Sequence, residues 1–264
     1  MYPSLWCIDV ALAALSWGVL IAALFNVSLL TFGPLLVLFG LVWSHTLFSR
    51  VERALKGNNV MFSAYYKSHA FLMILLSLSA FAATLWLLAF EVGTALLPFF
   101  AVPIFIRCLG QAPFLSKIRY FKQLCMAAAF VFACAVPAYY YGFVYTLFGL
   151  ISNPHLWCLV CLFFLFAVER EKPVNGHDGE LAATWVPAGL LVLVIPCAYH
   201  AFFGNCGDYE QNFYSTICIG AVCLHLLSTL RAKYNSTRWF VLCWVVMMLP
   251  ALLGILLFAP QTWF

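Results

Sequence analysis

Residues 68–106 read SHAFLMILLSLSAFAATLWLLAFEVGTALLPFFAVPIFI, an apolar run in which Glu91 is the only Asp, Glu, Lys or Arg. A helix needs about 20 apolar residues to cross a bilayer. The run is therefore long enough to cross twice, with the turn at Glu91. Because the apolar residues are continuous and do not alternate with polar ones, the run favours membrane helices over the strands of a barrel.

The same alternation of apolar runs and short charged segments continues through the chain. All 13 Lys and Arg residues fall in four segments, 50–67, 107–122, 170–172 and 231–238. The runs between them can cross the bilayer and return, so every basic residue reaches the same face. Positively charged loops mark the cytoplasmic side of a membrane protein. We therefore expect these four segments to be cytoplasmic.

The composition agrees with a membrane location. The chain is 66% hydrophobic and 8% charged, whereas a soluble domain is roughly 25% charged. The net charge of +4 is carried by the cytoplasmic loops, where anionic lipid head groups balance it. No nucleic-acid partner is expected, and the bilayer itself is the predicted partner.

The apolar runs predict the number of crossings. Residues 10–49, 68–106 and 123–168 hold two spans each, and residues 181–207, 211–230 and 239–264 hold one each. The sequence thus predicts an all-α polytopic membrane protein with about nine transmembrane helices in a single domain, residues 1–264. The N-terminus is expected in the cytoplasm and the C-terminus outside, in a cytoplasmic or inner membrane.

Cysteine and histidine give weaker indications. Cys158 and Cys161 form the only Cys-x-x-Cys, one helical turn apart, which is a spacing used by redox pairs. No second pair or flanking charge accompanies them. Seven other cysteines are scattered singly in apolar runs as small hydrophobic residues, and Cys206 is expected in an outer loop. The six histidines are not arranged as the paired ligands of a haem.

Carboxylates gather in the third basic segment. Residues 168–180 hold four of the nine acidic residues, and Glu169, Glu171 and Asp178 are our candidates for binding Mg²⁺. Carboxylates bind Mg²⁺, which bridges phosphate oxygens, while basic side chains neutralise the remaining charge. The candidates for diphosphate binding are Arg50, Arg53, Arg119 and Lys122. On loop composition alone, ordinary positive cytoplasmic loops with one acidic hinge are the simpler interpretation.

Three stretches resemble the UbiA superfamily of intramembrane prenyltransferases. Residues 46–69 are similar to the region between its second and third helices, and residues 118–137 are similar to a basic stretch that precedes an Ala-rich helix. Glu169 to Gly179, with Thr184 and Pro187 beyond, resembles its second aspartate motif with Glu in place of Asp. The nine-helix topology resembles that of the superfamily as well.

The resemblance implies an enzyme that transfers an isoprenyl group from a prenyl diphosphate to a membrane-embedded acceptor with the help of Mg²⁺. The first aspartate motif of the family is absent, because Glu52 is the only acid at the end of the second span. The activity is therefore either altered or lost. The alternative is a non-catalytic membrane protein, either a lipid or small-solute carrier or a structural relic of the same fold.

Overall fold

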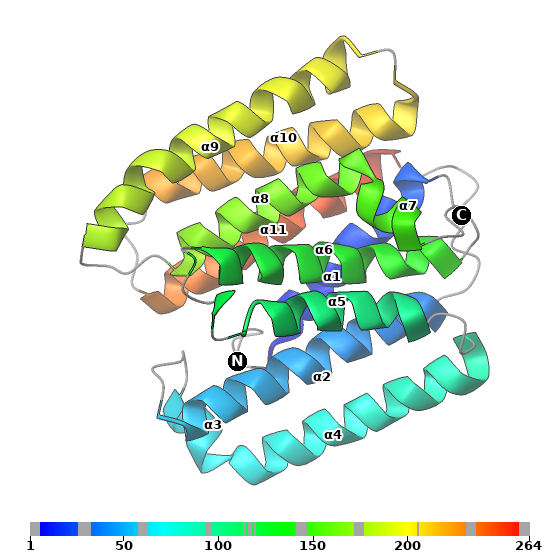
Figure 1. Ribbon diagram of the computed structural model, residues 1–264, viewed down its shortest axis with the longest axis vertical. Coiled ribbons are helices and arrows are strands. Elements are labelled where there is room, and N and C mark those ends of the chain that lie inside the picture. The colour runs from blue at the N-terminus through cyan, green and yellow to red at the C-terminus, as the bar shows by residue number, and fades with distance from the viewer. Residues whose placement is uncertain are drawn as a thin grey trace.

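The computed structural model of the chain is a bundle of long helices (Figure 1). It describes residues 6–25, 33–57, 63–92, 97–112, 114–115, 118, 120–140, 147–171, 177–204, 206–230 and 236–258. No strand occurs within these ranges.

The helices follow the apolar runs of the sequence in order. They are α1 (Ile8–Leu24), α2 (Gly33–Leu55), α3 (Ser63–Ser68), α4 (Ala70–Leu87), α5 (Leu97–Leu109), α6 (Phe121–Tyr140), α7 (Leu147–Ser152), α8 (Pro154–Glu171), α9 (His177–Phe202), α10 (Asp208–Thr229) and α11 (Ser236–Phe258). A π-helical turn, Leu88–Val92, continues α4 through Glu91.

Five helical segments are long and apolar enough to cross a membrane: Gly33–Leu55, Ala70–Phe90, Phe121–Ala138, Trp185–Phe202 and Asp208–Thr229. The described apolar parts of α1, α5, α8 and α11 are shorter. The expectation of a helical protein with membrane-length apolar helices is confirmed for the described residues. The number of nine spans and the placement of the termini stay predictions.

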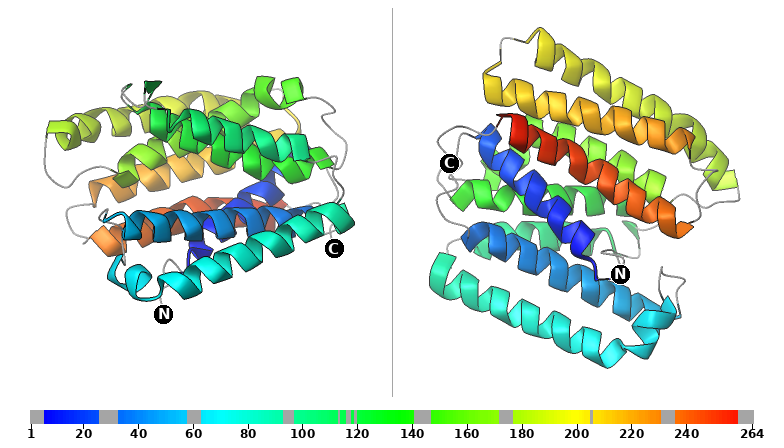
Figure 2. Two further views of the ribbon diagram at one scale, coloured as in Figure 1. Left: turned by 60° about the horizontal axis from the view of Figure 1, so that its bottom comes forward. Right: turned by 180° about the vertical axis from the view of Figure 1, so that it is seen from behind.

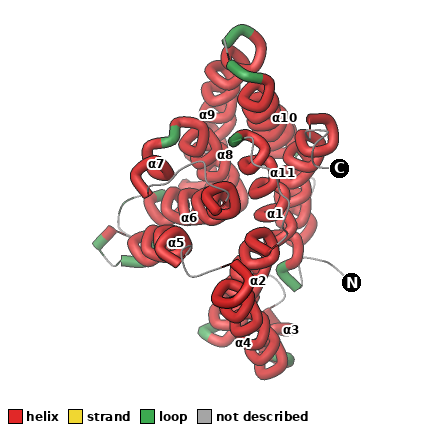
Figure 3. The backbone as a smooth tube through the Cα atoms, turned by 90° about the vertical axis from the view of Figure 1, so that its right-hand side faces the viewer, coloured by secondary structure: helices red, strands yellow, loops and turns green. Residues whose placement is uncertain are grey.

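The helices pack in two layers that join at α9 and α10. Seen from behind in Figure 2, α1 and α11 lie side by side, with α2 and α4 on one flank and α10 on the other. The end-on view in Figure 3 places α5, α6 and α8 on the opposite side of the bundle. α6 contacts α1, so the two layers share one interior.

The core is centred on α1, which is rich in alanine and is buried at 12 of its 17 residues. Small side chains let neighbouring backbones approach closely, which favours helix packing in lipid. A Cβ at Gly18 would lie 3.2 Å from the carbonyl oxygen of Cys134 on α6. On the other side, Nε1 of Trp17 donates a hydrogen bond of 2.9 Å to the carbonyl of Met247 on α11. These contacts hold α1 between the two layers.

Helix direction alternates, which collects the basic segments at one end of the bundle. The C-terminal ends of α2, α5, α8 and α10 and the N-terminal ends of α6, α9 and α11 lie on the left in Figure 1. The described parts of all four basic segments are therefore at this end, which we call the basic end. Residues 107–122 and 169–180 are expected on the same side of the bilayer, and their described parts lie at this one end.

Candidate anion-binding site

Two arginines from different helices converge on Ser49, in the last turns of α2. Nε of Arg53 donates a hydrogen bond of 3.2 Å to the backbone carbonyl of Ser49. Nη2 of Arg107, in the last turn of α5, donates a hydrogen bond of 3.2 Å to Oγ of Ser49. We call these three residues the Ser49 cluster. It lies at the basic end.

The local structure explains why the two arginines are held there. Arg53 follows Ser49 by four residues, so its side chain returns over the preceding turn of α2. Both arginines lie in the last turn of their helices, where carbonyl groups without helical partners and the helix dipole favour a positive charge. The ends of α2 and α5 thus each stabilise one guanidinium, and the packing of both helices against α6 brings the two together.

The cluster is strongly positive. The charge of Arg53 acts unfavourably on Arg107, and both charges act on the ring of His45, whose Nε2 lies 3.4 Å from Oγ of Ser49. Glu52 acts favourably on Arg107, but it is bound by Lys56 at 2.6 Å on the surface. An anion placed between the guanidinium groups would relieve this repulsion.

Arg107 also has an unused donor. Its Nε is buried and has no hydrogen-bond partner among the described residues. A buried donor without an acceptor costs about 1–3 kcal/mol. Guanidinium donors match the spacing of phosphate oxygens and bind them in pairs. The cluster therefore has the charge and the donor geometry to bind a phosphate group.

Arg50, one turn before Arg53, faces the bundle interior and is only 4% exposed. Its Nη1 donates a hydrogen bond of 3.5 Å to the hydroxyl of Tyr66 on α3, and Sγ of Cys7 lies 3.8 Å from the same hydroxyl. Asp9 on α1 also acts on its charge. Burial raises the pKa of the Tyr66 phenol, although the charge of Arg50 opposes the shift. Arg50 therefore connects α1, α2 and α3 and does not join the Ser49 cluster.

The remaining predicted site residues are placed as follows. Lys122 is exposed in the first turn of α6, and Glu169 is fully buried near the C-terminal end of α8. Glu171 and Asp178 belong to α8 and α9, but their side chains are outside the described set, as is Arg119 altogether. The described side chains include no group of three His, Cys, Asp or Glu residues with metal-binding geometry. The magnesium site stays a prediction, because two of its three ligands lie outside that set.

Arg107 is the functional candidate that sequence reasoning missed. It is the first basic residue after the 68–106 run. This position predicted only that it lies on the cytoplasmic face, among the other residues of its loop. Its importance depends on the bond between the ends of α5 and α2, both of which pack against α6, and nothing in the spacing of residues predicts that arrangement.

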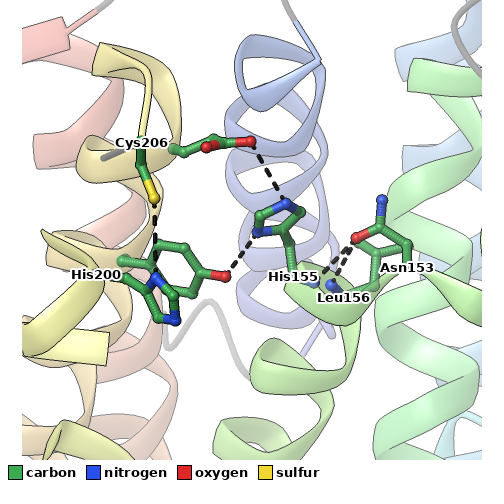
Figure 4. A network of polar contacts seen from close by, with 7 residues as sticks. Asn153, His155, Leu156, His200 and Cys206 are labelled. Atoms are coloured by element: carbon green, nitrogen blue, oxygen red, sulfur yellow. Dashed lines mark hydrogen bonds and ion pairs between the residues drawn. The ribbon is translucent and has the colours of Figure 1, made fainter. Parts of the chain in front are cut away.

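A second polar network lies at the opposite end of the bundle, at the start of α8 and around the turn between α9 and α10 (Figure 4). Nδ1 of His155 lies 2.8 Å from the hydroxyl of Tyr214, and its Nε2 lies 3.6 Å from Oε1 of Glu210. Sγ of Cys206 lies 3.8 Å from Nδ1 of His200. Both ends of the bundle therefore carry polar side chains, but of different chemistry.

Fold and site together define a helical protein with membrane-length apolar helices and a cationic end that suits an anion. Comparison of the chain with protein-family models, with curated proteins and with solved structures found no match. The resemblance to the UbiA superfamily therefore rests on the sequence stretches and on the predicted topology. The functional assignment accordingly depends on the geometry of the two ends.

Proposed function

We propose that this chain is a UbiA-like intramembrane prenyltransferase, which binds an isoprenyl diphosphate at the Ser49 cluster and transfers the isoprenyl group to an unidentified membrane-embedded acceptor. The observation that carries the proposal is the convergence of Arg53 and Arg107 on Ser49 at the end of an apolar bundle. A diphosphate on an isoprenyl chain has the matching chemistry, because its head is anionic and its tail is apolar.

The surroundings of the cluster suit an apolar tail. Phe48, beside Ser49 in α2, is 41% exposed, and Ile104, one turn before Arg107 in α5, is 62% exposed. An isoprenyl chain lying against such side chains removes apolar surface from the polar head-group region. Removing apolar surface from water is favourable by about 25 cal/mol for each Å² buried. The head would then remain at the level of the arginines.

The chain's own residues would act on the leaving group. When the allylic carbon–oxygen bond breaks, the electron pair leaves with the diphosphate, and the guanidinium groups of Arg53 and Arg107 stabilise the charge that develops there. The acceptor then attacks the allylic cation and loses a proton. Glu169, Glu171 and Asp178 are the residues that would hold Mg²⁺, and a bound Mg²⁺ supplies further neutralisation of the diphosphate. The full burial of Glu169 at the basic end fits such an oxygen ligand.

Binding of labelled farnesyl diphosphate to the purified chain in detergent, with and without Mg²⁺, tests the head-group site. Arg107→Gln and Arg53→Gln should each weaken binding about tenfold or more, since a hydrogen bond to a charged group is worth about 1.5–3 kcal/mol. Lys67→Gln is the matched control, because it removes one positive charge from the exposed side of α3 at the same end. The site is refuted when both arginine variants bind as tightly as the control.

Transfer is tested separately from binding. Release of diphosphate in the presence of membrane lipid extracts, and its loss in Glu169→Gln, would support the enzyme. One observation favours the non-catalytic alternative, namely that Arg50 is committed to Tyr66 inside the bundle. If the chain binds the diphosphate without consuming it, and moves a labelled prenyl lipid or solute across proteoliposomes, the carrier assignment replaces the enzyme.

A further inference from the structure

The hydroxyl group of Ser49 lies between an arginine and a histidine. Nη2 of Arg107 donates a hydrogen bond of 3.2 Å to Oγ of Ser49, and Nε2 of His45 lies 3.4 Å from the same oxygen. His45 precedes Ser49 by four residues on α2, which places the two side chains on one face of the helix. Because Arg107 occupies a lone pair of Oγ, the hydroxyl proton is left to point at the imidazole nitrogen. A hydroxyl, a base and a phosphate-binding group therefore meet at one place.

This arrangement differs from that of other serines in the helices. A helical serine commonly donates its hydroxyl to a carbonyl of the preceding turn, which ties up the proton. Four described serines do so: Ser16, Ser44, Ser79 and Ser228. Within the described part of the chain, Oγ of Ser49 contacts two side chains instead. Its hydroxyl is thus held by groups that take part in acid–base and phosphate chemistry.

The pair is also within reach of a ligand and of water. His45 is exposed and Ser49 is half-buried, and both lie in the last three turns of α2, at the basic end. A phosphate group bound by Arg53 and Arg107 would lie beside Oγ of Ser49, because both arginines bond to this residue. A serine hydroxyl beside a base is the usual form of an activated oxygen nucleophile.

We propose that Ser49 is the nucleophile of a diphosphatase activity, which removes the terminal phosphate of an isoprenyl diphosphate with His45 as the base. This activity rests on the head-group site proposed above, but a different bond of the substrate breaks. Prenyl transfer breaks the carbon–oxygen bond and releases diphosphate. Hydrolysis at Ser49 breaks the bond between the bridging oxygen and the terminal phosphorus, and it releases orthophosphate and an isoprenyl monophosphate.

The reaction proceeds in two steps and consumes one water molecule. His45 takes the proton of Ser49 while Oγ bonds to the terminal phosphorus. The bridging oxygen leaves with the electron pair as part of the monophosphate, which takes the proton from the imidazolium. In the second step a water molecule gives a proton to His45 and its oxygen attacks the phosphorus, after which Oγ leaves and recovers that proton. The guanidinium groups of Arg53 and Arg107 stabilise the charge that develops on the phosphate oxygens.

Farnesyl diphosphate that is radiolabelled in its terminal phosphate is the probe for the test. The full chain in detergent is incubated with it, and the labelled products are separated by chromatography. Labelled orthophosphate and unlabelled farnesyl monophosphate are the expected products. The proposal is overturned if no labelled orthophosphate forms. Labelled diphosphate as the sole product would support transfer and refute hydrolysis alone, whereas a chain that does not bind the probe would refute both activities.

Two variants and a matched control assign the reaction to the pair. Ser49→Ala should abolish orthophosphate release yet still bind the probe, because both guanidinium groups remain, and the retained binding shows that the variant is folded. His45→Gln should slow release about 100-fold or more, the usual contribution of a positioned base. Ser68→Ala is the control and should hydrolyse as the unaltered chain does. Oγ of Ser68 also lies beside a histidine, 2.8 Å from Nδ1 of His69, but it is on α3 and outside the Ser49 cluster. Orthophosphate release by Ser49→Ala at the rate of this control would overturn the proposal, and the unaltered chain decides by its products if a variant does not fold.

Discussion

Burial separates the roles of arginines that lie close together in the sequence. Arg50 and Arg53 are one turn apart on α2, yet Arg50 is 4% exposed and bonded to Tyr66, whereas Arg53 is exposed and reaches the carbonyl of Ser49. A cation inside a bundle must be held by polar partners, because an uncompensated buried charge is costly. A cation at the surface of a helix end remains accessible to a ligand. The two residues therefore have different effects when they are replaced.

Arg50→Gln should destabilise the fold more than it weakens ligand binding. Its loss removes the donor to Tyr66 and the positive charge near Asp9, at a cost of about 1–3 kcal/mol for polar groups left without their partner. Thermal unfolding in detergent measures this effect. Arg107→Gln is the comparison and should unfold close to the unaltered chain. Equal destabilisation of both variants would contradict the division of roles.

The phenol of Tyr66 predicts a dependence of stability on pH. Burial raises its pKa in the folded chain, so the stabilisation from the neutral phenol is present below the unfolded value of about 10 and is lost as the pH rises above it. The melting temperature of the unaltered chain should then fall more steeply above about pH 10 than that of Tyr66→Phe. If the melting temperatures of the two proteins fall equally with pH across this range, the pKa of Tyr66 is not raised in the folded chain.

At the scale of helices, glycines facing threonines set the closest contacts. A Cβ at Gly40 of α2 would lie 2.1 Å from Oγ1 of Thr84 on α4, and a Cβ at Gly254 of α11 would lie 2.6 Å from Oγ1 of Thr216 on α10. Each threonine hydroxyl donates back to a carbonyl one turn earlier in its own helix, which fixes its position. Two pairs of helices therefore approach where one partner has no side chain.

Gly40→Ala should destabilise the packing of α2 on α4 by about 1–3 kcal/mol, the usual cost of an extra carbon in a filled contact. The double variant Gly40→Ala with Thr84→Ala should recover most of that loss, because the clashing hydroxyl is removed. Gly207→Ala is the control, since a Cβ there meets nothing within 4 Å. Chemical or thermal unfolding in detergent gives the three values, and a single variant as stable as the control would show that the contact can relax.

Helix positions could be predicted from the sequence to a large extent. The 68–106 run contains α4 and most of α5. At the start of α8, Oδ1 of Asn153 accepts hydrogen bonds from the backbone N–H groups of His155 and Leu156. Such signals are local, because hydropathy and capping act within one segment. Pro137 lies within α6, which continues to Tyr140. A proline near a helix end removes few hydrogen bonds and need not stop the helix there.

The sites could be predicted only in part, because they depend on contacts between helices. Arg53 was a candidate from its loop, but Arg107 became one through the bond to Ser49 across 58 residues of sequence. Cys158 and Cys161 form a Cys-x-x-Cys by spacing, whereas in the structure Cys158 is half-buried and Cys161 is exposed on the same helix. Residue spacing reports neighbours along one helix, and the packing of helices with one another is set by the side chains of the whole interior.

The two ends of the whole molecule carry different chemistry. Arginines and lysines collect where α2 ends and α6 begins, whereas the described charged and thiol-bearing side chains at the turn between α9 and α10 are acidic residues, histidines and Cys206. If the bundle spans a bilayer, an anionic head group and a thiol reagent would each meet a different side. Phosphate chemistry would face the cytoplasm, where prenyl diphosphates are expected, and the thiol of Cys206 would face the more oxidising compartment.

This polarity can be tested with two native cysteines. Cys108, exposed in the last turn of α5, marks the basic end, and Cys206 marks the opposite end. A maleimide that does not cross membranes should label Cys206 in intact cells, and should label Cys108 only after the membrane is opened, because positive loops stay on the cytoplasmic side. Peptide mapping by mass spectrometry assigns each label. Labelling of Cys108 before Cys206 would show that the molecule has the opposite orientation, with the Ser49 cluster on the side without prenyl diphosphates. Equal labelling of both cysteines from outside would show that they do not lie on opposite sides of the bilayer.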